Sequence, residues 1–182
     1  MRDAMERFAA SLAAAGSADA DSFRPDLSRD EIATTASGLG LTFPEDIYVL
    51  YGYCDGMSPP KSAAAAVDGY RLLPLADAAA LHRTRGGGAL LPLFRRGERY
   101  YHVQCGLGDD RFGEVIHDIP EEEPWPAFAS VKTMFETICD WYAVGLEIAP
   151  EAGTNEYSMW THIALKHNPG VRLWRERRRY LS

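Results

Sequence analysis

The connections between strand-like segments in the middle of the chain constrain its fold more than any other sequence feature. Residue patterns typical of strands occur in four places, at Tyr70–Leu75, Leu90–Phe94, Arg99–Cys105 and Glu114–Ile119. In the third, Tyr101 alternates with Tyr100 and His102, so successive side chains face opposite sides. Parallel strands need crossover connections of about a dozen residues or more, and the connections from the second segment to the third and from the third to the fourth are shorter. The sequence therefore predicts an antiparallel meander.

Helical patterns flank this meander on both sides. Before it, Ser28 and Glu31 form the pattern of a capping box at the start of a helix. After it, Ser130 begins a strongly periodic helix, and two further helical segments cover Asn155–His167 and Val171–Leu181. Helices, a meander and helices again predict an α+β fold, with a mixed, mostly antiparallel sheet flanked by helices.

The stretch FPEDIYVLYGYCDGM, from Phe43 to Met57, predicts a third helix in the N-terminal half. Pro44 suits its first turn, and Gly56 supplies the left-handed residue that would end it. Cys54 followed by Asp55 could be a nucleophile with its orienting acid. However, the helical spacing places Cys54 on the buried stripe near a helix C-terminus, where the dipole raises a thiol pKa. We favour core packing for Cys54.

The length and composition predict one domain with an extension. The 182 residues are 46% hydrophobic and 25% charged, which permits a sizeable core without disulfides or a structural metal. We expect the α+β domain to span residues 1–150 and a helical C-terminal extension, packed on it, to span residues 151–182. The sequence makes no prediction of the oligomeric state.

Cysteine usage and hydropathy predict a cytoplasmic protein without a membrane span. The cysteines are three, odd in number and widely spaced, which is typical of free thiols in a reducing compartment. No apolar run approaches the roughly 20 residues needed to cross a bilayer. Charged residues interrupt the N-terminal stretch, so it does not have the pattern of a signal peptide.

The net charge of −7 is distributed unevenly. Residues 166–182 carry six basic side chains and one acid, a balance of +5, so the rest of the chain carries −12. An acidic body disfavours nucleic acid and favours basic protein partners or plain solubility. The basic tail could contact phosphates, but we prefer a solvated face of an amphipathic helix that pairs with the acidic body.

The order of these segments resembles the SUKH superfamily, which includes the Smi/Knr-type fungal cell-wall regulators and many bacterial immunity proteins. The resemblance covers roughly residues 33–145 and rests on five segments in order: GLGLTFPEDIYVLYGYCDGM, YRLLPLADAAALH, LLPLFRRGERYYHVQC, GEVIHDI and ASVKTMFETICDWYAVG. The chain departs from the family pattern at Cys54-Asp55-Gly56, where Asn-Gly is more usual, and in its unusually acidic loop before Trp125. The resemblance implies a non-catalytic protein-binding module without a cofactor. Many bacterial members of the family neutralise toxins by direct binding and the fungal members act in regulation, so we expect an immunity-type protein or a related regulatory adaptor.

The best candidates for contact with a basic protein partner, such as a cognate toxin domain, are an aromatic residue and loop acids. Trp125 follows three consecutive acids, and an aromatic anchor in an acidic rim suits a basic partner. The alternative is that Trp125 packs in the core and that the acids are solvated loop carboxylates. The candidate partner-binding residues are Glu121, Glu122, Glu123, Trp125, Asp109, Asp110, Tyr48 and Tyr53.

The rival interpretation is a metal-dependent hydrolase. It would use His82, His102 and His117 together with the loop carboxylates, which would have to converge on one point. The histidines show no spacing typical of shared metal ligation, so we predict no metal site and no catalytic residue. Arg85-Gly86-Gly87-Gly88 lacks the Lys-Ser/Thr of a P-loop, and we interpret it as a linker.

Overall fold

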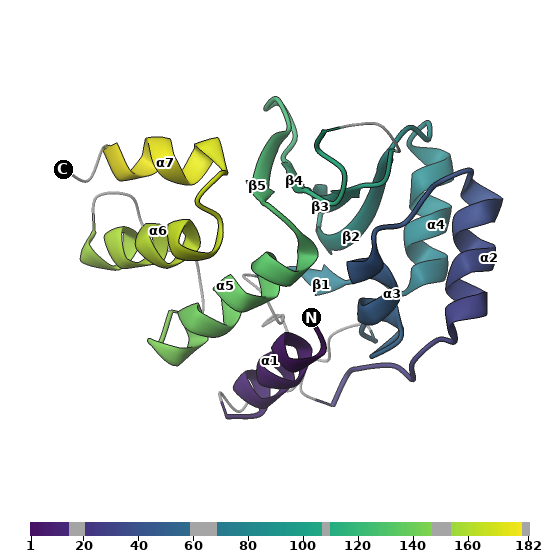
Figure 1. Cartoon of the computed structure of the whole chain (residues 1–182), viewed down its shortest axis with the longest axis horizontal. Helices are drawn as coiled ribbons and strands as arrows, with labels where there is room; N and C mark the ends of the chain where they lie inside the picture. Colours follow the sequence, from purple (N-terminus) through teal and green to yellow (C-terminus); the bar gives the residue numbers. More distant parts are fainter. Residues whose placement is uncertain (15–20, 59–68, 107–109, 147–153, 180–182) are drawn as a thin grey trace.

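The computed structural model describes residues 1–14, 21–58, 69–106, 110–146 and 154–179, and it has the predicted α+β fold (Figure 1). Within these residues it contains seven helices and a five-stranded sheet. The elements are α1 (Arg2–Ala14), α2 (Arg29–Leu39), α3 (Glu45–Tyr51), β1 (Arg71–Leu72), α4 (Leu75–Thr84), β2 (Leu90–Arg96), β3 (Arg99–Gln104), β4 (Val115–Asp118), β5 (Trp125–Phe128), α5 (Val131–Ala143), α6 (Asn155–His167) and α7 (Arg172–Arg179).

The sheet is an antiparallel meander, as predicted. Its strands are ordered β1-β2-β3-β4-β5, and every neighbouring pair is antiparallel. The register of β2 shifts between Pro92 and Phe94, next to the proline that lacks a backbone donor.

The fifth strand was not predicted, because Trp125-Pro126 read as part of an extended, proline-pinned loop. Strand β5 lies at the edge of the sheet and pairs with β4, with Trp125 opposite His117. A proline is tolerated in an edge strand, where its missing N–H need not interrupt a ladder on both sides. The prediction of a loop at this point was therefore wrong.

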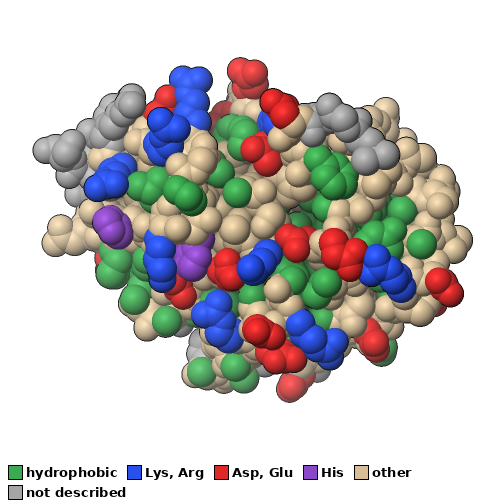
Figure 2. Space-filling view, viewed as in Figure 1, with side chains coloured by type: hydrophobic (Ala, Val, Ile, Leu, Met, Phe, Trp, Pro, Cys, Tyr) green, Lys and Arg blue, Asp and Glu red, His purple; other side chains and the backbone are tan. Residues whose placement is uncertain are grey.

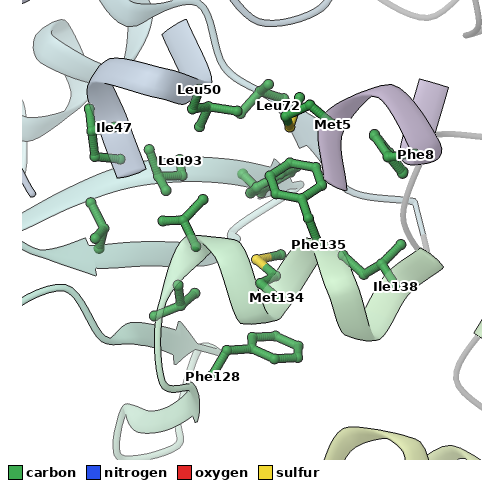
Figure 3. Close-up of a cluster of buried hydrophobic side chains, with 14 of the residues drawn as sticks. Met5, Phe8, Ile47, Leu50, Leu72, Leu93, Phe128, Met134, Phe135 and Ile138 are labelled. Carbon is green, nitrogen blue, oxygen red and sulfur yellow. The ribbon is translucent and has the colours of Figure 1, made fainter. Parts of the chain in front are cut away.

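Helices cover both faces of the sheet (Figure 1). On one face α5 packs beneath the strands, with the Phe135 ring 5.9 Å from that of Phe94. Helix α4 packs on β2 from the other face, and α2 packs on α4. Figure 3 shows side chains from α1, α3 and α5 meeting those of the strands in one apolar cluster, which includes Met5, Ile47, Leu50, Leu93, Met134 and Phe135.

Helix α3 ends earlier than its sequence pattern suggests. The predicted caps of two other helices are present: at the start of α2, Ser28 forms a capping box with Glu31, and at the start of α5, Ser130 forms one with Thr133. Helix α3, however, ends at Tyr51, so Cys54-Asp55-Gly56 lies in the turn that follows it. The prediction that Gly56 ends the helix was wrong.

Asp55 instead caps a different helix. Its Oδ1 atom accepts a hydrogen bond from the backbone N–H of Leu75, 2.8 Å away, at the first turn of α4. The N-cap residue of α4 is Pro74, whose side chain has no acceptor. Asp55 is buried and its other oxygen pairs with Arg24 at 3.1 Å. A residue twenty positions upstream thus supplies the cap that the local sequence lacks.

The C-terminal helices protect the edge of β5. The indole N–H of Trp174 in α7 donates to the carbonyl of Ala127, and the Asn168 side chain accepts from the N–H of Ala129 at 2.9 Å. Unpaired backbone groups at a sheet edge are a template for pairing with another chain. The predicted extension therefore does more than lie on the domain, because α6 and α7 share its core through Ala164 and Trp174.

Candidate functional site

The acidic candidates occupy the exposed turn between β4 and β5. Glu121, Glu122 and Glu123 are all exposed, and in Figure 2 acidic side chains stand at the top, where Figure 1 places this turn. Glu121 has a φ angle of +68°, the left-handed region that few non-glycine residues adopt. The N–H of Glu122 donates to the carbonyl of Ile119 and closes the turn. Three carboxylates are thereby presented to solvent on a defined backbone.

Trp125 is anchored from beneath by a stack of aromatic rings. It is half-buried and meets its cross-strand partner His117 edge to face, with ring centroids 5.1 Å apart. His117 stacks on Tyr101 with centroids 4.3 Å apart and is hydrogen-bonded to the Tyr70 hydroxyl at 2.7 Å. The indole Nε1 of Trp125 is buried and has no hydrogen-bond partner within the described part of the chain. Trp125 therefore belongs partly to the core and partly to the surface.

His117 is neutral at physiological pH. Burial lowers its pKa to about 4, and the nearby cations of Arg99 and Arg177 act in the same direction. An uncharged imidazole can be sandwiched between Tyr101 and Trp125 without the desolvation penalty of a buried cation. The His117 ring beneath Trp125 thus stays uncharged over the physiological pH range.

The remaining candidates do not join this turn. Asp110 is exposed, but it lies in the loop between β3 and β4, at the opposite end of β4 from Glu121. The expected acidic rim is therefore divided between the two ends of the sheet. Asp109 lies outside the described residues.

The two tyrosines of the α3 region have their own partners elsewhere. Tyr48 meets the ring of Phe43, and the Arg29 guanidinium lies 4.4 Å from its centroid. Tyr53 meets Phe23, and Arg2 lies over it. Both rings are half-buried, and neither ring partner is one that contacts Trp125.

The histidines of the rival hydrolase reading do not converge. His102 lies on the α4 face of the sheet, whereas His117, paired with Tyr101, lies on the opposite face. His82 is hydrogen-bonded through Nδ1 to the carbonyl of Leu90. No group of three histidine, cysteine or acidic side chains among the described residues is placed to hold a metal ion.

Sequence reasoning missed a polar cluster on the α4 face. The Asp118 carboxylate accepts hydrogen bonds from Arg85 at 3.0 Å and from His102 Nε2 at 3.1 Å. Burial lowers the pKa of His102, although Asp118 acts in the opposite direction, so the neutral ring donates its Nε2–H. Its Nδ1 atom is buried without a partner in the residues described. The sequence feature that could have indicated this cluster is the alternation along β3, which puts Tyr100 and His102 on one face. Their partners Arg85 and Asp118 come from elsewhere in the chain, so the alternation alone does not identify them.

The cysteines provide a test of the nucleophile reading of Cys54. All three are buried, and burial raises the pKa of Cys54 and Cys105 to about 12 and that of Cys139 to about 11. At pH 8 we expect the native protein to react negligibly with a thiol reagent such as dithionitrobenzoate, whereas three thiols per chain react in urea. If Cys54 reacted rapidly in the native protein, the interpretation of Cys54 as a nucleophile would be supported instead.

Comparisons with known proteins leave the fold and site to be interpreted on physical grounds. The chain matches no family model, and no curated protein matches its sequence. No helix within the described residues is long and apolar enough to cross a membrane.

Proposed function

We propose that this protein is a non-catalytic binding module of the immunity type, which neutralises a bacterial toxin by covering a basic active-site groove. The observation that carries the proposal is the exposed turn of Glu121, Glu122 and Glu123 beside an aromatic ring that is held in place by the fold. The SUKH-like order of elements, with a helix that enters at Pro44, a meander and a helix begun by Ser130, supports the same reading.

The physical chemistry of the turn suits a basic partner. Carboxylates at the rim of an interface accelerate encounter with a positively charged surface, while a central aromatic residue contributes a large share of the binding energy. A ring already fixed by His117 and Tyr101 loses little freedom on binding, which favours affinity. The surface is thus preorganised for occlusion rather than for chemistry.

The proposal is tested with the catalytic domain of a toxin encoded beside this chain. We expect stoichiometric binding by titration calorimetry and loss of toxin activity in the complex. Changing the three turn glutamates together to glutamine should slow association by about tenfold or more at low salt, because steering charge is lost. The separate change Trp125→Ala should weaken binding by about 2 kcal/mol or more through faster dissociation.

A matched control removes the same charge elsewhere. Asp3, Asp21 and Asp26 are exposed acids of the N-terminal segment, and α1 lies below the sheet in Figure 1, away from the β4–β5 turn. Changing all three to asparagine should leave toxin binding within about twofold of the unmodified protein, since rim charges far from a contact contribute little. Equal losses in the two triple variants, or no binding by the unmodified protein, would contradict the proposal.

A further inference from the structure

A row of side chains crosses the α4 face of the sheet from β1 to β4. The strand register places Arg71 opposite Arg95, Arg95 opposite Tyr100, and Tyr100 opposite Asp118. Directly paired residues of antiparallel strands point to the same face, so these four side chains lie side by side across β1, β2, β3 and β4. Arg85, the residue that caps the C-terminus of α4, reaches over this row. We call Arg71, Arg85 and Arg95 the arginine row.

Tyr100 organises two of these guanidinium groups. The Arg85 group lies 4.3 Å from the centroid of the Tyr100 ring, and the Arg95 group lies 5.8 Å from the same centroid. The Nε–H of Arg95 also donates to the carbonyl of Gly97 at 2.9 Å, which fixes its stem. Cation–π contacts of this kind hold a guanidinium over the ring while its remaining N–H groups stay available.

The arginine row carries more positive charge than the neighbouring carboxylate can neutralise. Asp118 pairs with Arg85 and is hydrogen-bonded to His102 as well. Within the part of the chain that the structure describes, the Arg71 side chain forms no ion pair or hydrogen bond and Arg95 forms no ion pair. Three guanidiniums therefore face one carboxylate, on a chain whose net charge is −7. Arg71 and Arg95 are like charges directly opposite each other, an arrangement that destabilises a sheet. An anion bound between them would relieve this repulsion.

We propose that the arginine row binds a phosphoryl group of a small ligand. A phosphate monoester carries a charge of about −1.5 to −2 at pH 7, which matches the two positive charges that Asp118 leaves uncompensated, whereas one carboxylate would match only half. Planar guanidinium forks donate paired hydrogen bonds to phosphate oxygens. This site is independent of the proposed toxin contact, because it uses neither the acidic turn nor Trp125.

The test is a titration of the full-length, 15N-labelled protein with pyrophosphate at low salt, followed by NMR. We expect saturable shifts of the Arg Nε–H signals of Arg85 and Arg95 and of the amides of Tyr100 and Asp118. Arg95→Gln should weaken pyrophosphate binding about tenfold or more, as expected for loss of a charged hydrogen-bond donor. Arg71→Gln should weaken it similarly, and as a change at a half-buried position of the edge strand β1 it provides a second variant if Arg95→Gln loses the native spectrum.

The matched control is Arg83→Gln, which removes the same charge from an exposed position two residues before Arg85. It should leave pyrophosphate binding unchanged. The proposal is overturned if the shifts do not saturate, if Arg83→Gln weakens binding as much as Arg95→Gln, or if the shifts are as large at Arg175 and Arg178 of α7. It is also overturned if a short single-stranded oligonucleotide shifts the arginine row and pyrophosphate does not, because the ligand is then a nucleic-acid backbone.

Discussion

Gly56→Ala is expected to lower the free energy of unfolding by about 3 to 5 kcal/mol, combining left-handed backbone strain with overpacking. Gly56 has a φ angle of +71°, which L residues rarely adopt. A Cβ atom there would lie 2.5 Å from the Leu73 carbonyl carbon and 2.5 Å from the Pro74 nitrogen. Backbone atoms cannot rotate away as a flexible side chain could, so the turn after α3 or the start of α4 must shift. Urea unfolding followed by circular dichroism measures the loss.

Gly40→Ala is the matched control for this prediction. Gly40 also has a left-handed conformation, with a φ angle of +67°, but nothing lies within 4 Å of the position its Cβ would take. We expect its loss to be only about 1 kcal/mol, the strain of a left-handed alanine alone. The difference between the two variants isolates the close approach of Gly56 to the Leu73–Pro74 backbone. Losses of equal size would show that the close approach contributes nothing.

Trp174→Ala is expected to lower the free energy of unfolding by about 3 to 5 kcal/mol, the usual range for truncating a buried tryptophan. Trp174 is almost fully buried, and its ring contacts those of Trp160 and Phe128 at centroid distances of 4.9 and 5.9 Å. The variant also removes the donor to the Ala127 carbonyl at the β5 edge. An uncovered edge can pair with a second chain, so sedimentation velocity should show more self-association by the variant than by the unmodified protein under the same conditions.

Two further variants separate packing from hydrogen bonding at this position. Trp174→Phe keeps an aromatic ring in the core and loses the indole N–H, so we expect a smaller loss of about 1 to 3 kcal/mol, the penalty of an unsatisfied carbonyl. Met159→Ala, on the exposed side of α6, should change stability by less than about 0.5 kcal/mol. If Trp174→Ala behaved like Met159→Ala, the C-terminal helices would not share the core of the domain.

The exposed glutamates of the candidate binding surface were predictable from the sequence, but the aromatic residues that pack beneath Trp125 were not. Three consecutive glutamates between prolines cannot be buried cheaply, so their exposure follows from composition alone. The stack of Tyr70, Tyr101 and His117 beneath Trp125 joins segments that are up to 55 residues apart. The register of β3, β4 and β5 brings Tyr101, His117 and Trp125 together, and Tyr70 joins them from the residue before β1. The division of the loop acids between two ends of the sheet follows from the same antiparallel register.

The sequence by itself determined the features that depend on residues a few positions apart. The capping boxes at Ser28 and Ser130 and the antiparallel meander follow from local hydrogen bonding and short connections. Only the tertiary structure decided that Asp55 caps α4 and that the proline-containing segment at Trp125 is a strand. The physical reason is that backbone groups take whichever partner the packed chain brings within reach, and local spacing does not encode those distant partners.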